Sequence, residues 1–109
     1  MVAGTADTWL DPEVNYYQPF EALSVDNKTA VWLENADHMF SMSCSPAWEA
    51  TMFNVCFDPV WDMNRTHDLT DHFVAAFLLA EFYGDADAAA ALAPDAVQFP
   101  GIDYKTTSF

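Results

Sequence analysis

The most restrictive feature of this sequence is residues 29–34, a short apolar run that is rich in β-branched and aromatic side chains. Such a run is typical of a β-strand. Residues 1–4 have the character of the end of another buried strand. Between them, Asp11 and Pro12 mark the start of a helix that we expect to reach residue 23, with a break or kink at Pro19. A strand, a helix and a second strand form a βαβ unit, so we predict an α/β fold with two parallel strands and a right-handed crossover.

The rest of the chain divides into a helical part and an extended part. We expect one domain of 109 residues. Its expected parts are the βαβ unit with its loops (1–38), a loop and short-helix insertion (39–65), the C-terminal helices (66–92) and an extended tail (93–109).

The strongest helical pattern follows Thr66, which we expect to be the N-cap, and ends at Gly84 as the C-cap. Apolar residues recur at helical spacing between these two positions, which predicts one buried face. A short helix through Val55 is also expected, and it begins at Pro46.

The composition indicates a folded core under a very acidic surface. Hydrophobic residues make up 52% of the chain, whereas 17 acidic residues oppose only 3 basic ones, for a formal net charge of −14. Such a surface repels phosphate backbones and anionic lipids, so nucleic acids and membrane surfaces are not expected partners. The apolar stretch 73–82 is interrupted by Glu81 and is too short to span a bilayer.

The two cysteines, Cys44 and Cys56, lie close enough in sequence to form a disulfide. Closing a loop of this size contributes roughly 3 kcal/mol in the chain-entropy view. A disulfide would indicate an exported, periplasmic or extracellular protein. The alternative is two buried thiols in a reducing compartment such as the cytoplasm.

A two-stranded sheet with a single crossover is not a self-sufficient fold. Parallel strands are covered by helices on both faces and need neighbours at their edges. We therefore expect that upstream strands are missing and that residue 1 is not a biological start. The alternative is a chain that dimerises through an exposed sheet edge.

Asp7 and His38 are the residues that most plausibly carry chemistry, because each directly follows one of the two expected strands. Loops at the carboxyl ends of parallel strands line the same edge of a sheet. A carboxylate bound to one imidazole nitrogen fixes the tautomer and leaves the other nitrogen free to accept a proton. The alternatives are a turn-forming aspartate and a loop histidine without a chemical task.

Two loop motifs and several shorter stretches resemble the C-terminal part of α/β-hydrolases. The matching segments are Gly-Thr-Ala-Asp-Thr at 4–8 with Asp-Pro at 11–12, Glu-Asn-Ala-Asp-His-Met-Phe at 34–40, and residues 57–63, 67–69, 76–79 and 97–102. They are most similar to dienelactone hydrolase-like enzymes, which group with platelet-activating-factor acetylhydrolase-like and chlorophyllase-like esterases. The resemblance covers nearly all of this chain but only about the last third of such an enzyme.

The resemblance implies a serine esterase in which Asp7 is the acid and His38 the base, acting on a small-molecule ester without a metal or organic cofactor. The Gly-x-Ser-x-Gly turn that presents the nucleophile in this superfamily does not occur in the sequence. The nucleophile and the oxyanion hole are therefore expected in a missing N-terminal part. By itself, the chain is expected to be nearly inactive.

Several other residues near the two motifs are weaker candidates for function. Trp9, Met39 and Phe40 flank the loops and could line an acyl or alcohol pocket, although packing explains them equally well. Ser41, Ser43 and Cys44 are near His38, but no strained elbow surrounds them. A metal site using His38 and Asp37 lacks a ligand signature.

Two functions of different classes remain open at this point. The first is a part of a carboxylic-ester hydrolase that supplies the acid and the base of a Ser-His-Asp triad. The alternative is a non-catalytic acidic interaction module, or the small subunit of a split protein.

Overall fold

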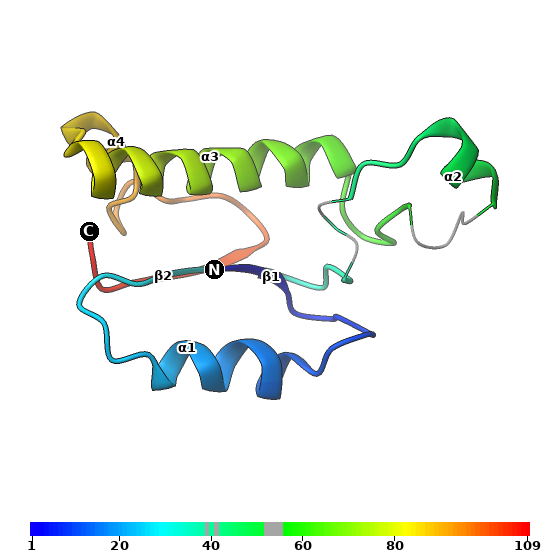
Figure 1. Cartoon of the computed structure of the whole chain (residues 1–109), viewed down its shortest axis with the longest axis horizontal. Coiled ribbons are helices and arrows are strands. Elements are labelled where there is room, and N and C mark those ends of the chain that lie inside the picture. Colours follow the sequence, from blue (N-terminus) through cyan, green and yellow to red (C-terminus); the bar gives the residue numbers. More distant parts are fainter. Residues whose placement is uncertain (39, 41, 52–55) are drawn as a thin grey trace.

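The computed structural model describes residues 1–38, 40, 42–51 and 56–109. Its elements in chain order are β1 (Val2–Gly4), the π-helix η1 (Glu13–Tyr17), α1 (Gln18–Ala22), β2 (Thr29–Leu33), α2 (Pro46–Thr51), α3 (Met63–Tyr83), α4 (Ala86–Ala91) and β3 (Ile102–Thr106). The sheet lies between two helical layers, with α1 on one face and α3 on the other, while α2 projects at one end (Figure 1). The architecture is therefore α/β in the general sense.

The sheet is mixed and has the strand order β1-β2-β3. β1 runs parallel to β2, with Val2 opposite Val31, as the βαβ pattern predicted. β3 runs antiparallel to β2, with Ile102 opposite Leu33. The central strand β2 is thus paired on both sides, whereas β1 is paired with β2 alone among the described residues.

The strand β3 was not predicted, since we expected only an extended tail there. Its side chains alternate between half-buried Ile102, Tyr104 and Thr106 and exposed Asp103 and Lys105. This period of two is typical of a strand with one face on the core. The same pattern is compatible with an extended tail that has no neighbour. The pairing with β2 is what makes this segment a strand.

The core is divided by β2, whose five residues are all buried. Val31 and Leu33 belong to a cluster with Leu69 and Phe73 of α3. Ala30 and Trp32 belong to a second cluster on the α1 face. Because side chains alternate along a strand, one apolar segment fills both layers and holds the helices on opposite faces.

The crossover helix contains a change of winding rather than a break. η1 closes with a bond from Gln18 N to Glu13 O, and α1 begins at Gln18 with Pro19 in its first turn. Pro19 has no N–H to donate to the carbonyl of Asn15, so the regular α-helical ladder is interrupted there. The predicted irregularity lies at this point, and the chain accommodates it by forming a π-turn.

The N-cap of the long helix α3 lies four residues before the predicted one. Asp62 is its N-cap and accepts a hydrogen bond from Arg65 N, so the prediction that Thr66 is the N-cap was wrong. Thr66 is instead fully buried, and its hydroxyl donates to Met63 O at 2.9 Å and to Phe40 O. Gly84 ends the helix with φ 65°, in the left-handed conformation expected of a C-cap glycine.

The insertion between the sheet and α3 carries the disulfide Cys44–Cys56, with 5.7 Å between the two Cα atoms. α2 begins at Pro46 and is described as far as Thr51, and the expected continuation to Val55 lies outside the described residues. Among the described helices, none has both the length and the apolar character needed to cross a membrane.

Candidate functional site

The candidate site is built where β1 and β2 end side by side. Thr5 N donates to Leu33 O at 3.0 Å, and Ala6 N donates to Ala36 O at 3.0 Å, so the two following loops stay paired beyond the strands. Gly4 permits this close approach, because a Cβ at that position would lie 2.9 Å from Asp37 O and closer still to the Ala36 carbonyl. The parallel pairing thus delivers both loops to one rim of the sheet.

The side chains of Asp7 and His38 meet at this rim. Asp7 Oδ2 lies 2.7 Å from His38 Nδ1. The Asp7 side chain is only 1% exposed, whereas that of His38 is 30% exposed. A buried carboxylate therefore holds one nitrogen of a partly accessible imidazole. Among the described residues, none forms a hydrogen bond with His38 Nε2.

The other Asp7 oxygen also has a structural task. Asp7 Oδ1 accepts hydrogen bonds from Trp9 N and from Leu10 N, each at 2.8 Å. This is the turn-forming role that the alternative interpretation foresaw. The two oxygens of Asp7 thus have different partners, because Oδ1 binds the backbone of its own loop while Oδ2 contacts the imidazole.

A residue that the sequence analysis missed completes the environment of Asp7. The Tyr16 hydroxyl donates a hydrogen bond to Asp7 Oδ2, the same oxygen that binds His38. Burial raises the pKa of Asp7, but hydrogen bonds from Tyr16, Leu10 N, His38 and Trp9 N outweigh it and lower the pKa to about 2. The carboxylate is therefore ionised at neutral pH. No spacing rule pointed to Tyr16, which lies in the π-helix η1.

Trp9 covers one face of the imidazole. Its ring is stacked on that of His38, with 5.0 Å between centroids and 14° between the planes. Trp9 is itself 59% exposed, so it forms an open aromatic wall beside the site. Of the other two residues predicted to line a pocket, Phe40 is 8% exposed and packs in the core with Leu69, while Met39 lies outside the described residues.

The backbone that carries His38 is held by two further carboxylates. Asp37 Oδ1 accepts hydrogen bonds from Thr8 N at 2.9 Å and from His38 N at 2.7 Å. Burial raises the pKa of Asp37, and these bonds outweigh it, so the pKa is lowered overall. Asp58 Oδ2 in turn accepts from Asp37 N at 2.6 Å. The sequence analysis did not single out Asp58, because no local pattern indicated this contact.

The weaker candidates do not form a second site among the described residues. Cys44 is bonded to Cys56, so it offers no thiolate. No group of three or more histidine, cysteine or acidic residues in the described part of the chain could hold a metal ion. Ser41 lies outside the described residues.

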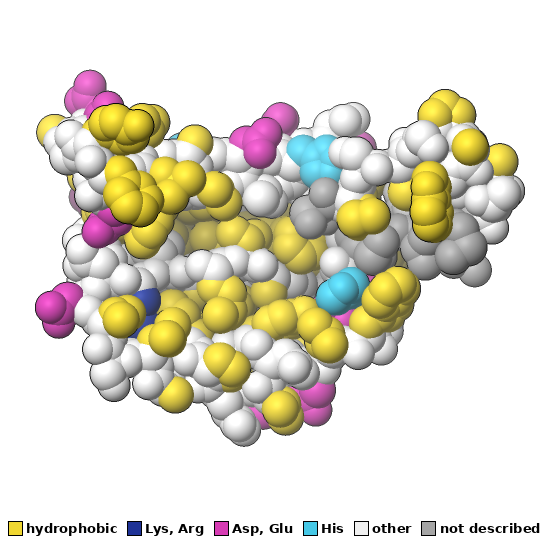
Figure 2. All heavy atoms as spheres, in the orientation of Figure 1, with side chains coloured by type: hydrophobic (Ala, Val, Ile, Leu, Met, Phe, Trp, Pro, Cys, Tyr) yellow, Lys and Arg dark blue, Asp and Glu magenta, His cyan; other side chains and the backbone are white. Residues whose placement is uncertain are grey.

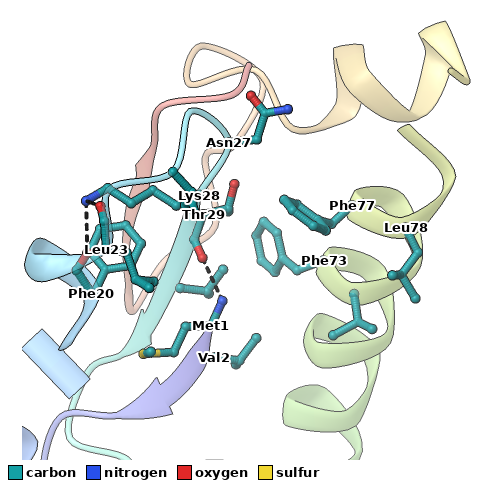
Figure 3. Close-up of a pocket in the computed structure, with 13 residues that line it drawn as sticks. Met1, Val2, Phe20, Leu23, Asn27, Lys28, Thr29, Phe73, Phe77 and Leu78 are labelled. Carbon is teal, nitrogen blue, oxygen red and sulfur yellow. Dashed lines mark hydrogen bonds between the residues drawn. The ribbon is translucent and has the colours of Figure 1, made fainter. Parts of the chain in front are cut away.

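An apolar groove of about 270 Å³ lies between α1 and α3, beside the start of β1 and of β2. Val2, Phe20, Leu23, Phe73 and Phe77 contribute to its lining, from β1, α1, the turn after α1, and α3 (Figure 3). Hydrophobic side chains gather in this hollow between the helical layers (Figure 2).

Only alternate residues of β1 direct their backbone hydrogen-bonding groups at β2. Met1 and Thr5 direct their hydrogen-bonding groups at β2. Because this direction alternates along a strand, Val2 and Gly4 direct theirs away from β2, and Val2 is the one of the two that lines the groove. The free edge therefore offers peptide groups next to an apolar surface, as the edge of an incomplete sheet does.

Comparison with family models, with curated proteins and with solved structures gave no match, so the interpretation of this site rests on its own residues and geometry.

Proposed function

We propose that this chain is the C-terminal part of an α/β-hydrolase fold and supplies the acid and the base of a serine esterase. The contact of 2.7 Å between Asp7 Oδ2 and His38 Nδ1 carries this proposal. Both residues have the properties that this role requires. The Asp7 carboxylate is buried and ionised, and no described residue forms a hydrogen bond with the second imidazole nitrogen of His38. The order of acid before histidine along the chain also agrees with this superfamily.

The geometry supports a conventional acyl-transfer sequence. His38 Nε2 takes the proton of a serine hydroxyl while the serine oxygen attacks the ester carbonyl carbon. The imidazolium then gives this proton to the leaving alcohol oxygen, and an acyl-serine remains. A water molecule, activated by Nε2 in the same way, hydrolyses the acyl-serine. Asp7 remains ionised throughout and stabilises the positive imidazolium.

The serine and the oxyanion-hole donors would come from polypeptide beyond these residues. The groove beside β1 favours this arrangement, because its apolar lining and outward peptide groups suit a further parallel strand between the two helical layers. A parallel neighbour ends at the same rim as β1 and β2. Residues that follow such strands could therefore reach His38.

The decisive experiment measures ester hydrolysis by the complete gene product that contains these residues. We expect His38→Gln to lower kcat/KM for p-nitrophenyl acetate on the order of 10³-fold or more, because a base of the triad is lost. The matched control is His67→Gln, which changes a histidine of α3 outside the site and should alter kcat/KM less than about threefold. Equal activity of His38→Gln and wild type would contradict the proposal.

A second candidate is an acidic interaction module that binds a partner through the free edge of β1. The same groove favours it, since an extended peptide could add to the sheet without any chemistry at His38. The disulfide Cys44–Cys56 favours an oxidising compartment for either function.

A further inference from the structure

We propose that Tyr16 is a positioning residue of the Asp7–His38 pair, and that its hydroxyl moderates the hydrogen bond between them. The catalytic meaning of this role rests on the proposed esterase function, whereas the role itself does not. The Tyr16 hydroxyl and His38 Nδ1 both bind Asp7 Oδ2. Tyr16 therefore acts on the imidazole through the oxygen that they share.

The contacts of Asp7 leave its carboxylate little freedom. Two donors, Trp9 N and Leu10 N, bind Oδ1 from the loop of Asp7 itself. Tyr16 is the donor that comes from the crossover helix, nine residues further along the chain. Together these bonds fix the rotation of the carboxylate, so Oδ2 faces His38 in one orientation.

Tyr16 and Tyr17 both lie in the π-helix η1 and have different partners. Tyr17, the next residue in η1, packs edge-on against Trp32 of β2, with 5.0 Å between ring centroids. Tyr16 and Tyr17 are both half-buried and pack against the cluster on the α1 face. The wider winding of η1 lets one tyrosine anchor the helix while its neighbour binds Asp7. Single π-turns inside helices frequently occur at functional sites.

The protonation states of Tyr16 and Asp7 keep the Tyr16 hydroxyl a hydrogen-bond donor to Asp7 over a wide range of pH. Burial, the hydrogen bond to Asp7 and the charge of Asp7 raise the pKa of Tyr16 to about 12. The pKa of Asp7 is lowered to about 2. Between these limits Tyr16 keeps its proton and Asp7 keeps its charge. The other titratable groups facing Asp7 are His38 and Asp37.

The expected effect on His38 has a definite sign. A hydrogen bond donated to Oδ2 withdraws electron density from that oxygen, so the oxygen attracts the Nδ1 proton less strongly. Removing the Tyr16 hydroxyl should therefore strengthen the bond from His38 Nδ1. A purely structural role for the tyrosine predicts no such change.

The test uses proton and carbon NMR of the full chain and compares Tyr16→Phe with the matched control Tyr17→Phe. We expect Tyr16→Phe to move the Nδ1 proton resonance of His38 downfield at neutral pH. It should also raise the titration midpoint of the Asp7 carboxyl carbon by roughly one unit, a tenfold change in proton affinity. Tyr17→Phe should leave both signals in place.

A second measurement keeps the test valid if Tyr16→Phe folds poorly. Replacing the four tyrosines with 3-fluorotyrosine makes the phenol a stronger donor, so the Nδ1 resonance should move upfield. Unchanged resonances in both samples, or equal shifts in Tyr17→Phe, would overturn the role of Tyr16. These readouts need no turnover. If they behave as expected while His38→Gln retains esterase activity, the esterase proposal alone fails.

Discussion

At the residue scale, the sequence indicated which side chains directly follow a strand, but it did not indicate which other side chains contact them. Asp7 and His38 could be singled out because each follows an apolar strand, and the structure brings their side chains into contact. Tyr16 and Asp58 could not be predicted. Tyr16 reaches Asp7 through a π-turn, and Asp58 is 21 positions away from its partner Asp37. Neither contact follows from a local pattern.

The lowered pKa of Asp7 predicts a specific loss of stability in acid. An aspartate titrates near 3.9 when unfolded, and Asp7 titrates at about 2 in the folded chain. A lowered folded-state pKa contributes stability that is present above about pH 4 and is lost as the pH falls through about 2. The difference corresponds to ~2–3 kcal/mol of unfolding free energy.

Urea unfolding at several values between pH 5 and pH 2 measures this loss. We expect Asp7→Asn to have a shallower dependence of unfolding free energy on pH than wild type. Asp11→Asn, which changes an exposed aspartate shortly before η1, should run parallel to wild type. If the unfolding free energies of Asp7→Asn and wild type fell in parallel with pH, Asp7 would not be the source of the stability lost in acid.

At the element scale, strong local patterns predicted the elements and weak ones did not. β2 was predictable because its apolar residues fill both layers of the core. The start of α3 was misplaced because Asp62 and Thr66 are both good N-cap residues, and burial of Thr66 decides between them. β3 depends on its long-range pairing with β2, which its own five residues do not encode.

The close approach of the β1 and β2 loops predicts that Gly4 tolerates no side chain. We expect Gly4→Ala to lower the unfolding free energy by ~1–3 kcal/mol, because its Cβ meets the backbone of Ala36 and Asp37. Gly84→Ala is the comparison: its Cβ meets nothing within 4 Å, so only the backbone strain at φ 65° costs stability, about 1 kcal/mol.

Urea denaturation of both variants checks this order, and the Nδ1 resonance of His38 reports the site. Gly4→Ala should also move that resonance upfield, because separating the loops lengthens the hydrogen bond between His38 and Asp7. If Gly4→Ala proved as stable as wild type, the tight packing of the two loops would be refuted.

At the scale of the whole molecule, the net charge and the free edge of β1 have opposite effects on association between copies of the chain. The formal charge of −14 opposes association between copies. The groove beside β1 favours it, because apolar side chains and outward peptide groups lie together there. The sequence indicated a sheet too small to stand alone. It could not indicate which edge would remain open, since β3 covers the other one.

If the chain is an incomplete part of a larger sheet, it should associate into heterogeneous species through this groove. We expect Leu78→Glu, which places a charge in the groove, to reduce the mean mass measured by gel filtration with light scattering. Val60→Glu adds the same charge at an exposed position outside the groove and should change the mass much less. A sharp monomer or dimer for the wild-type chain would favour the interaction module instead.

The alignment of Val2 with Val31 has one more consequence. A slip of β1 by two residues along β2 preserves the alternation of side chains, so burial alone discriminates weakly against it. The same slip moves the end of β1 by roughly 6.6 Å, which is too far for Asp7 to touch His38. The contact between Asp7 and His38 therefore reports the register of β1 against β2, and a molecule in which β1 has slipped lacks this contact.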